Sequence, residues 1–264
     1  MAEQTVEESS WAGLIRGHRE PPETVKIRMP LRQSHTGVAG SFQIVGTDGR
    51  HWWVKPPHQG ELDWALTTEF VVSRAGAMIG APTCRSAVIE ITRDFDGWEY
   101  RRGGYLREGL GHGMEEVESA KEERSNLRYR TEDDNKSRQA GIYALYDWCW
   151  GRDEQWLHST TNDMTIYSHD HGWYLPPSGP KWDTQLLRDY VDLPHPLPQS
   201  SAGLHYPAVE AVARELEKID KSLLAAMLRR VPGAWPVSDA ELETLGWFLE
   251  RRAPAVAARM RALV

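Results

Sequence analysis

The chain lacks the features that mark membrane, secreted and disulfide-stapled proteins. It has only two cysteines in 264 residues, Cys84 and Cys149, and neither has a nearby partner, which predicts buried thiols in a reducing cytoplasm. No apolar run approaches the roughly 18–20 residues that a membrane span needs. The N-terminus is polar and acidic and carries no apolar segment of a secretory signal. We therefore expect a cytoplasmic protein with no membrane partner.

An excess of positive charge is also missing. The formal net charge is −7, whereas a protein that binds nucleic acid through phosphate contacts needs a basic surface, so we expect no nucleic-acid partner. Hydrophobic residues make up 40% of the chain and charged residues 26%, which excludes wholesale disorder. Phenylalanine is scarce, with 4 residues, whereas tryptophan reaches 12. That many indoles indicate extensive packing surfaces but no particular chemistry.

The first half of the chain predicts a small sheet. Residues 1–30 show little periodicity and several prolines, so we expect a loosely attached arm. Residues 41–55 have the pattern of two strands joined by an Asp-Gly turn. A helix at 61–79 and a short β-branched strand at 86–92 follow.

The second half is predicted to be mainly helical. The expected elements are a solvated helix or loop at 115–136, a helix at 135–150, a strand at 164–168, an extended and exposed proline-rich stretch at 174–200, and helices at 207–230 and 239–262, the last interrupted near Pro254. This order predicts an α+β protein of two lobes. The N-terminal arm (1–30) is followed by a small β-rich lobe (31–114) and a larger, mainly helical C-terminal lobe (115–264).

Lys55 and Glu69 form the first candidate pair. Lys55 ends the second strand of the predicted hairpin, and Glu69 lies in the middle of the next helix. Kinases hold a phosphate-binding lysine in this way, with an acidic partner on the following helix. Just before the hairpin, residues 34–41 form a small-residue stretch in which Gly37, Gly40 and Ser41 would let the backbone approach a ligand closely.

Two later segments each offer a carboxylate. In Gly151-Arg-Asp-Glu-Gln-Trp-Leu-His158, Asp153 is the candidate for the base that accepts a substrate hydroxyl proton, and His158 stands five residues later, where a metal ligand is expected. In His169-Asp-His-Gly172, Asp170 has the Asp-x-Gly form that presents a carboxylate to Mg²⁺. Each segment alone is unremarkable. Their order along the chain predicts a kinase-type site.

Several segments resemble HipA-like kinases, which belong with the phosphatidylinositol kinases in the atypical branch of the protein-kinase-like fold. The resemblance covers about residues 34–176 and is carried by Trp53-Val-Lys-Pro, Thr68-Glu-Phe-Val-Val, Ile79-Gly-Ala-Pro, Leu145-Tyr-Asp-Trp-Cys-Trp-Gly-Arg-Asp153 and Tyr167-Ser-His-Asp-His-Gly172. It implies a protein-kinase-like fold and an ATP-dependent phosphotransferase that uses Mg²⁺ or Mn²⁺ and a protein Ser/Thr hydroxyl as acceptor.

The same resemblance implies a role for each candidate residue. Lys55 would contact the nucleotide phosphates, Glu69 would orient Lys55, and Asp153 would be catalytic. Asp170 would bind the metal, and residues 34–41 would cover the phosphates.

Two departures leave alternatives open. Glu154 and Gln155 replace the family's Arg-His, and His158 replaces its Asn, so His158 would favour Mn²⁺ over Mg²⁺ as a metal ligand. The alternatives are a pseudokinase that binds nucleotide as a regulatory module, a metal-dependent hydrolase built on the histidines around Asp170, and an acidic adaptor. The Lys55–Glu69 pair discriminates among them, because a hydrolase has no use for it.

Overall fold

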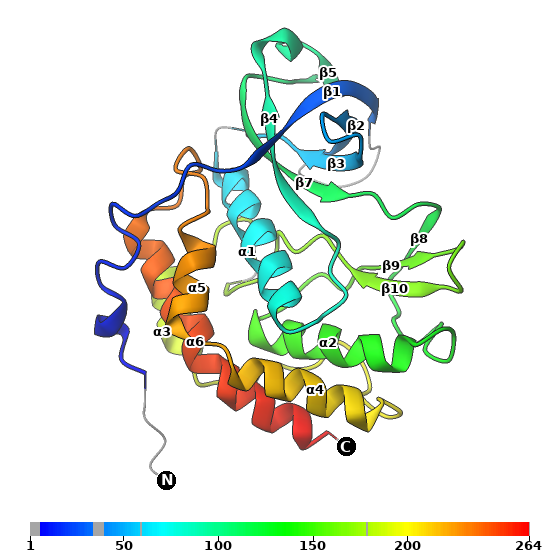
Figure 1. The fold of residues 1–264 in the computed structure, drawn as a ribbon, viewed down its shortest axis with the longest axis vertical. Coiled ribbons are helices and arrows are strands. Elements are labelled where there is room, and N and C mark those ends of the chain that lie inside the picture. The colour runs from blue at the N-terminus through cyan, green and yellow to red at the C-terminus, as the bar shows by residue number, and fades with distance from the viewer. Residues whose placement is uncertain (1–5, 34–39, 59, 178, 264) are drawn as a thin grey trace.

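The computed structural model describes residues 6–33, 40–58, 60–177 and 179–263. It has two lobes, a β-barrel at the top of Figure 1 and a larger lobe of helices below it. The predicted α+β, two-lobed architecture is confirmed. No helix in these described ranges combines the length and apolar character that crossing a bilayer requires.

The first lobe is a closed five-stranded barrel. Its strands, in neighbouring order, are β1 (Thr24–Gln33), β2 (Phe42–Gly46), β3 (His51–Lys55), β7 (Gly109–Glu115) and β4 (Ser86–Ile91). The predicted hairpin is β2 and β3, which pair antiparallel around a turn at Gly49, where φ is +78°. Alternation along β3 buries Trp52 and Val54 inside the barrel and leaves Trp53 and Lys55 on its outer face.

One helix lies between the barrel and the second lobe. Helix α1 (Trp64–Met78) follows a short 3₁₀ turn, η2 (Glu61–Asp63), and confirms the predicted helix. Its Leu66, Phe70 and Val71 belong to the apolar core of the second lobe, so α1 fixes the two lobes relative to each other. The remaining elements of the first lobe are η3 (Arg93–Phe95), β5 (Glu99–Arg101) and β6 (Gly104–Tyr105).

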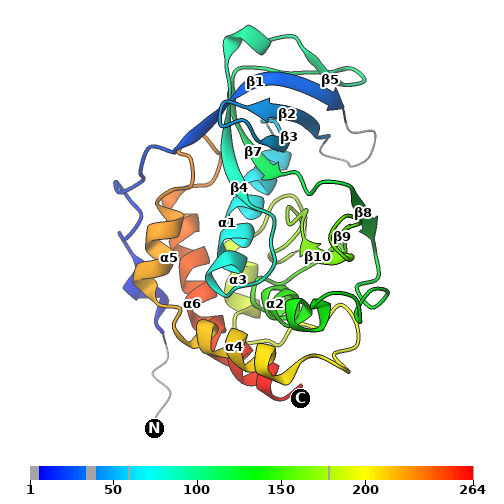
Figure 2. The ribbon, with the colours of Figure 1, turned by 45° about the vertical axis from the view of Figure 1, so that its right-hand side comes forward.

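The second lobe places a small sheet beside a bundle of helices (Figure 2). The sheet is antiparallel, in the order β10 (Thr165–Ser168), β9 (Trp156–Ser159) and β8 (Ala120–Glu123). The helices are α2 (Asn135–Trp148), α3 (Thr184–Tyr190), α4 (Tyr206–Glu217), α5 (Lys221–Leu228) and α6 (Asp239–Arg261). The predicted helix at 135–150 and strand at 164–168 therefore form as α2 and β10.

The N-terminal segment differs from the expected loose arm. Trp11, the last residue of η1 (Glu8–Trp11), and Ile15 are fully buried, and the Trp11 Nε1 donates a hydrogen bond of 2.6 Å to Glu250 in α6. Residues 24–33 are strand β1 of the barrel. The expectation is wrong for the described part of this segment, because one indole anchors it to α6 and a strand pairing holds its end.

Four further expectations need correction. Residues 115–136 contain strand β8 and no helix before α2 begins at Asn135, and the proline-rich stretch 174–200 contains α3 and a buried Trp182. The helix expected at 207–230 is divided, because Asp220 caps a new helix by accepting a hydrogen bond from the backbone N–H of Leu223. Helix α6 continues through Pro254, since its buried face extends past that residue.

Candidate active site

Lys55 joins two carboxylates that come from different lobes. Its Nζ makes ion pairs with Glu69 of α1 and with Asp170, which lies two residues beyond the end of β10. Strand β3 aims Lys55 out of the barrel, and the middle of α1 presents Glu69 to it. The structure therefore brings together three of the residues that the sequence singled out.

Glu69 is also bound by the backbone of the Asp-x-Gly turn. The N–H groups of His171 and Gly172 each donate a hydrogen bond of 3.0 Å to its carboxylate. A Cβ on Gly172 would lie 3.1 Å from Glu69 Oε1 and 3.2 Å from the Cβ of Ala65, closer than side-chain atoms normally approach. Glycine at position 172 therefore suits the close approach of the helix to this turn. Through its hydrogen bonds, Glu69 positions Lys55 and the Asp170 turn together.

Lys55 and Asp170 stabilise each other's charged forms. Burial on its own lowers the pKa of Lys55, but the negative charges of Glu69 and Asp170 outweigh burial and raise that pKa above its usual range. The Lys55 ammonium in turn lowers the pKa of the Asp170 carboxyl well below its usual value. At neutral pH Lys55 is a cation and Asp170 an anion, the states that phosphate binding and metal binding require.

Asp153 and Asp170 emerge at the same end of the small sheet. Strands β9 and β10 pair antiparallel with Trp156 opposite Ser168, so the residues just before β9 and just after β10 are neighbours. Both aspartates have left-handed backbone, with φ of +57° and +54°. Non-glycine residues in this conformation store strain that the surrounding structure must hold, and such strain gathers at functional sites.

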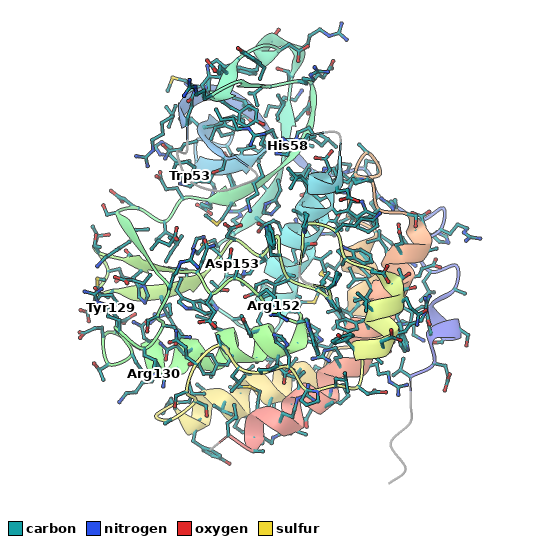
Figure 3. The ribbon with its side chains drawn as sticks, turned by 180° about the vertical axis from the view of Figure 1, so that it is seen from behind. Trp53, His58, Tyr129, Arg130, Arg152 and Asp153 are labelled. Atoms are coloured by element: carbon teal, nitrogen blue, oxygen red, sulfur yellow. The ribbon has the colours of Figure 1, made fainter. Side chains whose placement is uncertain are left out.

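Asp153 has two side-chain neighbours of its own. The Gln155 amide donates a hydrogen bond of 2.5 Å to Asp153 Oδ2, and the Arg124 guanidinium lies 3.6 Å from Oδ1. In Figure 3, Asp153 lies in the second lobe below Trp53, which is at the lower edge of the barrel. Gln155, which the sequence marked as a departure from the HipA-like pattern, therefore orients the carboxylate.

Glu122 and Arg124 are site residues that sequence reasoning missed. Glu122 is on β8, and its pKa is raised first by burial and then by the negative charges of Asp170 and Asp153. Arg124 directly follows β8 at the end of the sheet where Asp153 lies. Their segment is dense in charges of both signs and was expected to be a solvated helix or loop, so no sequence signal pointed to a strand beside the site.

His158 is not brought to Asp170. It pairs with Ile166 and, on the other side, with Lys121, and its ring is fully buried against Tyr129 at 5.0 Å between centroids. Burial lowers the pKa of His158 to about 4. Adjacent residues of a strand point to opposite faces, and His158 is on the face turned into the lobe.

The small-residue stretch before β2 is described only at its end. Gly37 lies outside the described residues, whereas Gly40 is buried with φ of +64° and Ser41 is half-buried. A Cβ on Gly40 would lie 2.7 Å from Arg101 Cδ. The left-handed backbone thus favours glycine at the point where this stretch joins β2, and a side chain there would also have to displace Arg101.

Whether Asp170 and its neighbours could hold a divalent ion depends on how many protein ligands that ion needs. Within the described ranges, no group of three or more His, Cys, Asp or Glu side chains is arranged to hold a metal. Mg²⁺ keeps several waters and binds through one or two carboxylates together with substrate phosphates. Asp170 beside Lys55 fits that mode, in which the metal arrives with a nucleotide.

Comparison with known proteins identifies the fold. No family model and no curated protein sequence matches the chain. Among solved structures, a Helicobacter pylori proinflammatory kinase, CtkA, superposes with a TM-score of 0.60 at 12% identity, over 92% of this chain and 99% of that one. Two structures of the Golgi casein kinase, one with Mn/ADP bound, match with a TM-score of 0.46 at 11% identity, over 97% of this chain and 77% or 75% of theirs. The chain has a kinase-like fold.

Proposed function

We propose that the protein is an ATP-dependent phosphotransferase that acts with Mg²⁺ or Mn²⁺. The observation that carries the proposal is the contact of Lys55 with both Glu69 and Asp170, in a kinase-like fold and with Asp153 at the same end of the small sheet. A structural ion pair would need only one carboxylate. Here one lysine connects the two lobes at the point where a triphosphate would lie.

Each residue then has a defined task. Lys55 binds the phosphates, and Glu69 holds Lys55 and the turn that carries Asp170. Asp170 would hold the divalent ion, which when bound supplies positive charge to the phosphoryl group being transferred. Asp153 orients the acceptor hydroxyl and takes its proton, while Gln155 fixes its carboxylate.

The acceptor is proposed to be a protein Ser/Thr hydroxyl. The resemblance of residues 34–176 to HipA-like kinases supports this choice. A cytoplasmic location also stays a prediction, and Cys84 and Cys149 agree with it as buried free thiols. A lack of nucleic-acid or membrane partners is likewise a prediction from composition.

The outer face of the barrel supplies a surface for the nucleotide base. Four register partners form a row across neighbouring strands, and they are Arg32, Gln43, Trp53 and Met114. Trp53 is two residues from Lys55 on the same face of β3, about 6.5 Å along the strand. A base joined to phosphates at Lys55 would therefore meet the Trp53 indole, and every base can stack on an indole.

Arg32 covers that indole. Its guanidinium lies 5.1 Å from the centroid of the Trp53 ring and 3.1 Å from a carboxylate oxygen of Glu116. We infer that a base stacks on Trp53 and that Arg32, held by Glu116, closes over it.

Thermal unfolding with nucleotide tests the proposal. Only the folded chain assembles Lys55 and Asp170, so ATP with Mg²⁺ or Mn²⁺ at 100 times its Kd should stabilise it by about 2.7 kcal/mol. Lys55→Met should greatly weaken this effect, because it removes the charge that faces the phosphates. Arg93→Met, at an exposed site on η3, is the control and should bind like wild type. No shift at millimolar nucleotide would overturn the proposal.

A pseudokinase is the second candidate, and one observation favours it. Asp153 is already engaged by Gln155 and approached by Arg124, so the acceptor must displace or share those contacts. Incubation with γ-labelled ATP and a series of divalent ions, followed by intact-mass measurement, decides between the two. Nucleotide binding without transfer to the protein itself, to water or to any offered acceptor would favour the pseudokinase.

A further inference from the structure

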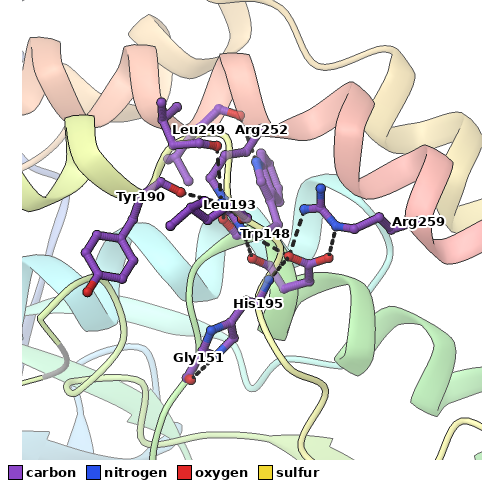
Figure 4. A network of polar contacts seen from close by, with 10 residues as sticks. Trp148, Gly151, Tyr190, Leu193, His195, Leu249, Arg252 and Arg259 are labelled. Carbon is purple, nitrogen blue, oxygen red and sulfur yellow. Dashed lines mark hydrogen bonds and ion pairs between the residues drawn. The ribbon is translucent and has the colours of Figure 1, made fainter.

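The backbone just before Asp153 is held by a buried histidine from another part of the chain. His195 Nε2 is 2.7 Å from the carbonyl oxygen of Gly151 (Figure 4). A carbonyl oxygen can only accept, so Nε2 carries the proton and donates. On its other side, the Gly151 N–H donates a hydrogen bond of 2.7 Å to the carbonyl of Tyr146. Hydrogen bonds therefore hold both the N–H and the carbonyl of Gly151.

The His195 ring has little freedom to move. It stacks on Tyr146 at 5.3 Å and lies against Trp150 at 4.4 Å between ring centroids. Its own backbone N–H donates to Asp147 Oδ1 at 3.3 Å. The imidazole is thus fixed by two aromatic rings and by its main chain, with Nε2 directed at Gly151.

A buried ion cluster secures the segment that carries His195. The fully buried Arg252 of α6 contacts Asp147 Oδ1 at 2.9 Å, and Arg259 contacts the same carboxylate at 2.7 Å. Arg252 also donates to the backbone carbonyls of Asp147, Trp148, Tyr190, Val191 and Leu193. One guanidinium therefore ties the end of α2 to the turn that leads to His195.

We propose that His195 is a positioning residue for Asp153, which rests on the proposed phosphotransfer. Trp150 and Asp153 flank Gly151-Arg152 with left-handed backbone, φ of +54° and +57°, and such residues persist only when their surroundings fix them. The His195–Gly151 bond is the fixed point between them. Arg252 of α6 fixes the segment that carries His195, and His195 fixes Gly151. The position of Asp153, two residues after Gly151, therefore depends on α6.

The consequence for catalysis is one of orientation. Misplacing a reacting group by about 1 Å can cost about 10²-fold in rate without changing which groups are present. Loss of the His195 donor should leave the nucleotide residues Lys55, Glu69 and Asp170 in place, because their contacts do not involve the 190–195 segment. It should therefore lower phosphoryl transfer and leave nucleotide affinity unchanged.

The test compares single-turnover transfer with calorimetric binding of ATP and Mg²⁺ or Mn²⁺. We expect His195→Ala to lower the transfer rate at least tenfold with an unchanged Kd. His195→Gln should restore most of the rate, because its amide N–H can reach the Gly151 carbonyl. Val191→Ala removes buried side-chain volume from the same segment without removing the donor, so it should lower the melting temperature but keep the rate.

The outcomes separate the two proposals. A folded His195→Ala that transfers like wild type overturns the role of His195, as does a glutamine variant no faster than alanine. If the alanine variant does not fold, His195→Asn replaces it in the comparison with His195→Gln, since asparagine is one methylene too short to reach Gly151. A wild type that binds nucleotide and transfers nothing overturns the phosphotransfer itself, and with it the role of His195.

Discussion

At the scale of single residues, Asp153 and Asp170 differ in what they contact and so in what their loss should do. Asp170 pairs with Lys55, so Asp170→Asn should weaken metal-dependent nucleotide binding and abolish transfer together. Asp153 contacts Gln155 and Arg124 instead, so Asp153→Asn should keep nucleotide affinity and lose the 10²–10⁴-fold that general-base catalysis typically contributes. Calorimetry and single-turnover transfer measure both quantities.

A matched control keeps this comparison specific. Asp94 is exposed on η3, and Asp94→Asn should change neither binding nor transfer. The assigned roles fail if both site variants bind nucleotide normally, or if Asp153→Asn transfers at the full rate.

Trp53 should decide affinity for the base but not for the phosphates. Stacking on an aromatic side chain contributes about 1–3 kcal/mol per base, so Trp53→Ala should weaken ATP binding by about 5–150-fold at that conversion. Binding of inorganic tripolyphosphate should hardly change, because Lys55 stays in place. Trp53→Phe should recover part of the loss, and Tyr105→Ala, at an exposed site on β6, should do nothing. An equal loss for ATP and tripolyphosphate would exclude base stacking.

His158 should have no influence on the choice of metal. Its ring is fully buried against Tyr129, so His158→Asn should leave the ratio of Mn²⁺-supported to Mg²⁺-supported activity unchanged. The measurement is that ratio in both proteins at equal folded fraction. A shift toward Mg²⁺ would return His158 to the metal site.

These residues show what spacing along the sequence can and cannot reveal. The meeting of Lys55 and Glu69 was predictable, because Lys55 ends a strand and Glu69 lies in mid-helix, so the direction of each side chain follows from its element. Asp170 lies two residues beyond β10, and its Asp-x-Gly motif indicated it instead. His158 was assigned to the metal by counting five residues from Asp153, and the early start of β9 at Trp156 puts it on the buried face. Counting residues fails where the length of a loop is unknown.

At the scale of elements, the N-terminal segment and α6 are coupled through one close contact. A Cβ on Gly246 would overlap the Trp11 indole, so Gly246→Ala should destabilise the wild type. Trp11→Ala should cost about 3–5 kcal/mol, as removal of a buried indole does. In the Trp11→Ala background, the effect of Gly246→Ala on the free energy of unfolding should change sign. Gly246→Ala should then stabilise the fold by up to about 1 kcal/mol, because alanine is the better helix former.

Urea unfolding of the wild type, the two single variants and the double variant measures the coupling between Trp11 and Gly246. Gly203→Ala is not a suitable control, because its positive φ adds strain. Exposed Arg16→Ala, close to Trp11 in the chain, is a better one and should leave the effect of Gly246→Ala unaltered. Equal effects of Gly246→Ala with and without the indole would show that Trp11 does not occupy this place.

Elements with local signals were predictable, and those fixed by distant partners were not. The β2–β3 hairpin, α1, β4, α2 and β10 each have a turn, a stop signal or a periodic pattern of their own. Strand β8 exists because it pairs with β9, in which Ala120 lies opposite Ser159 and Glu123 opposite Trp156, and the anchoring of Trp11 depends on a glycine in α6. Contacts between residues so far apart in the chain produce no signal in the local sequence pattern.

At the scale of the whole molecule, buried histidines make both lobes sensitive to acid. His112 lies in the barrel, and His158 and His195 lie in the second lobe. Burial lowers the pKa of His112 well below its usual value and lowers those of His158 and His195 to about 4. The unfolded chain titrates near 6.5, so between pH 6.5 and about 4 it binds more protons than the folded chain.

The sign of the pH dependence follows from that difference in bound protons. Stability rises with pH wherever the unfolded state binds more protons, so the free energy of unfolding should fall as the pH drops from 6.5 toward 4 and should gain nothing from these groups above 6.5. Carboxylates whose pKa values are lowered by Lys or Arg partners also begin to lose their contribution to stability in the lower part of this window, because the unfolded chain starts to protonate there while the folded chain does not. The histidine contribution must therefore be isolated by substitution. His158→Leu removes one such group, while its Tyr129 contact stays apolar. Between pH 7.5 and 4.5, we expect urea unfolding to show a smaller loss of stability for His158→Leu than for wild type. Parallel curves for wild type and His158→Leu would mean that His158 is protonated equally in the folded and unfolded chains, and that its burial does not make the fold sensitive to acid.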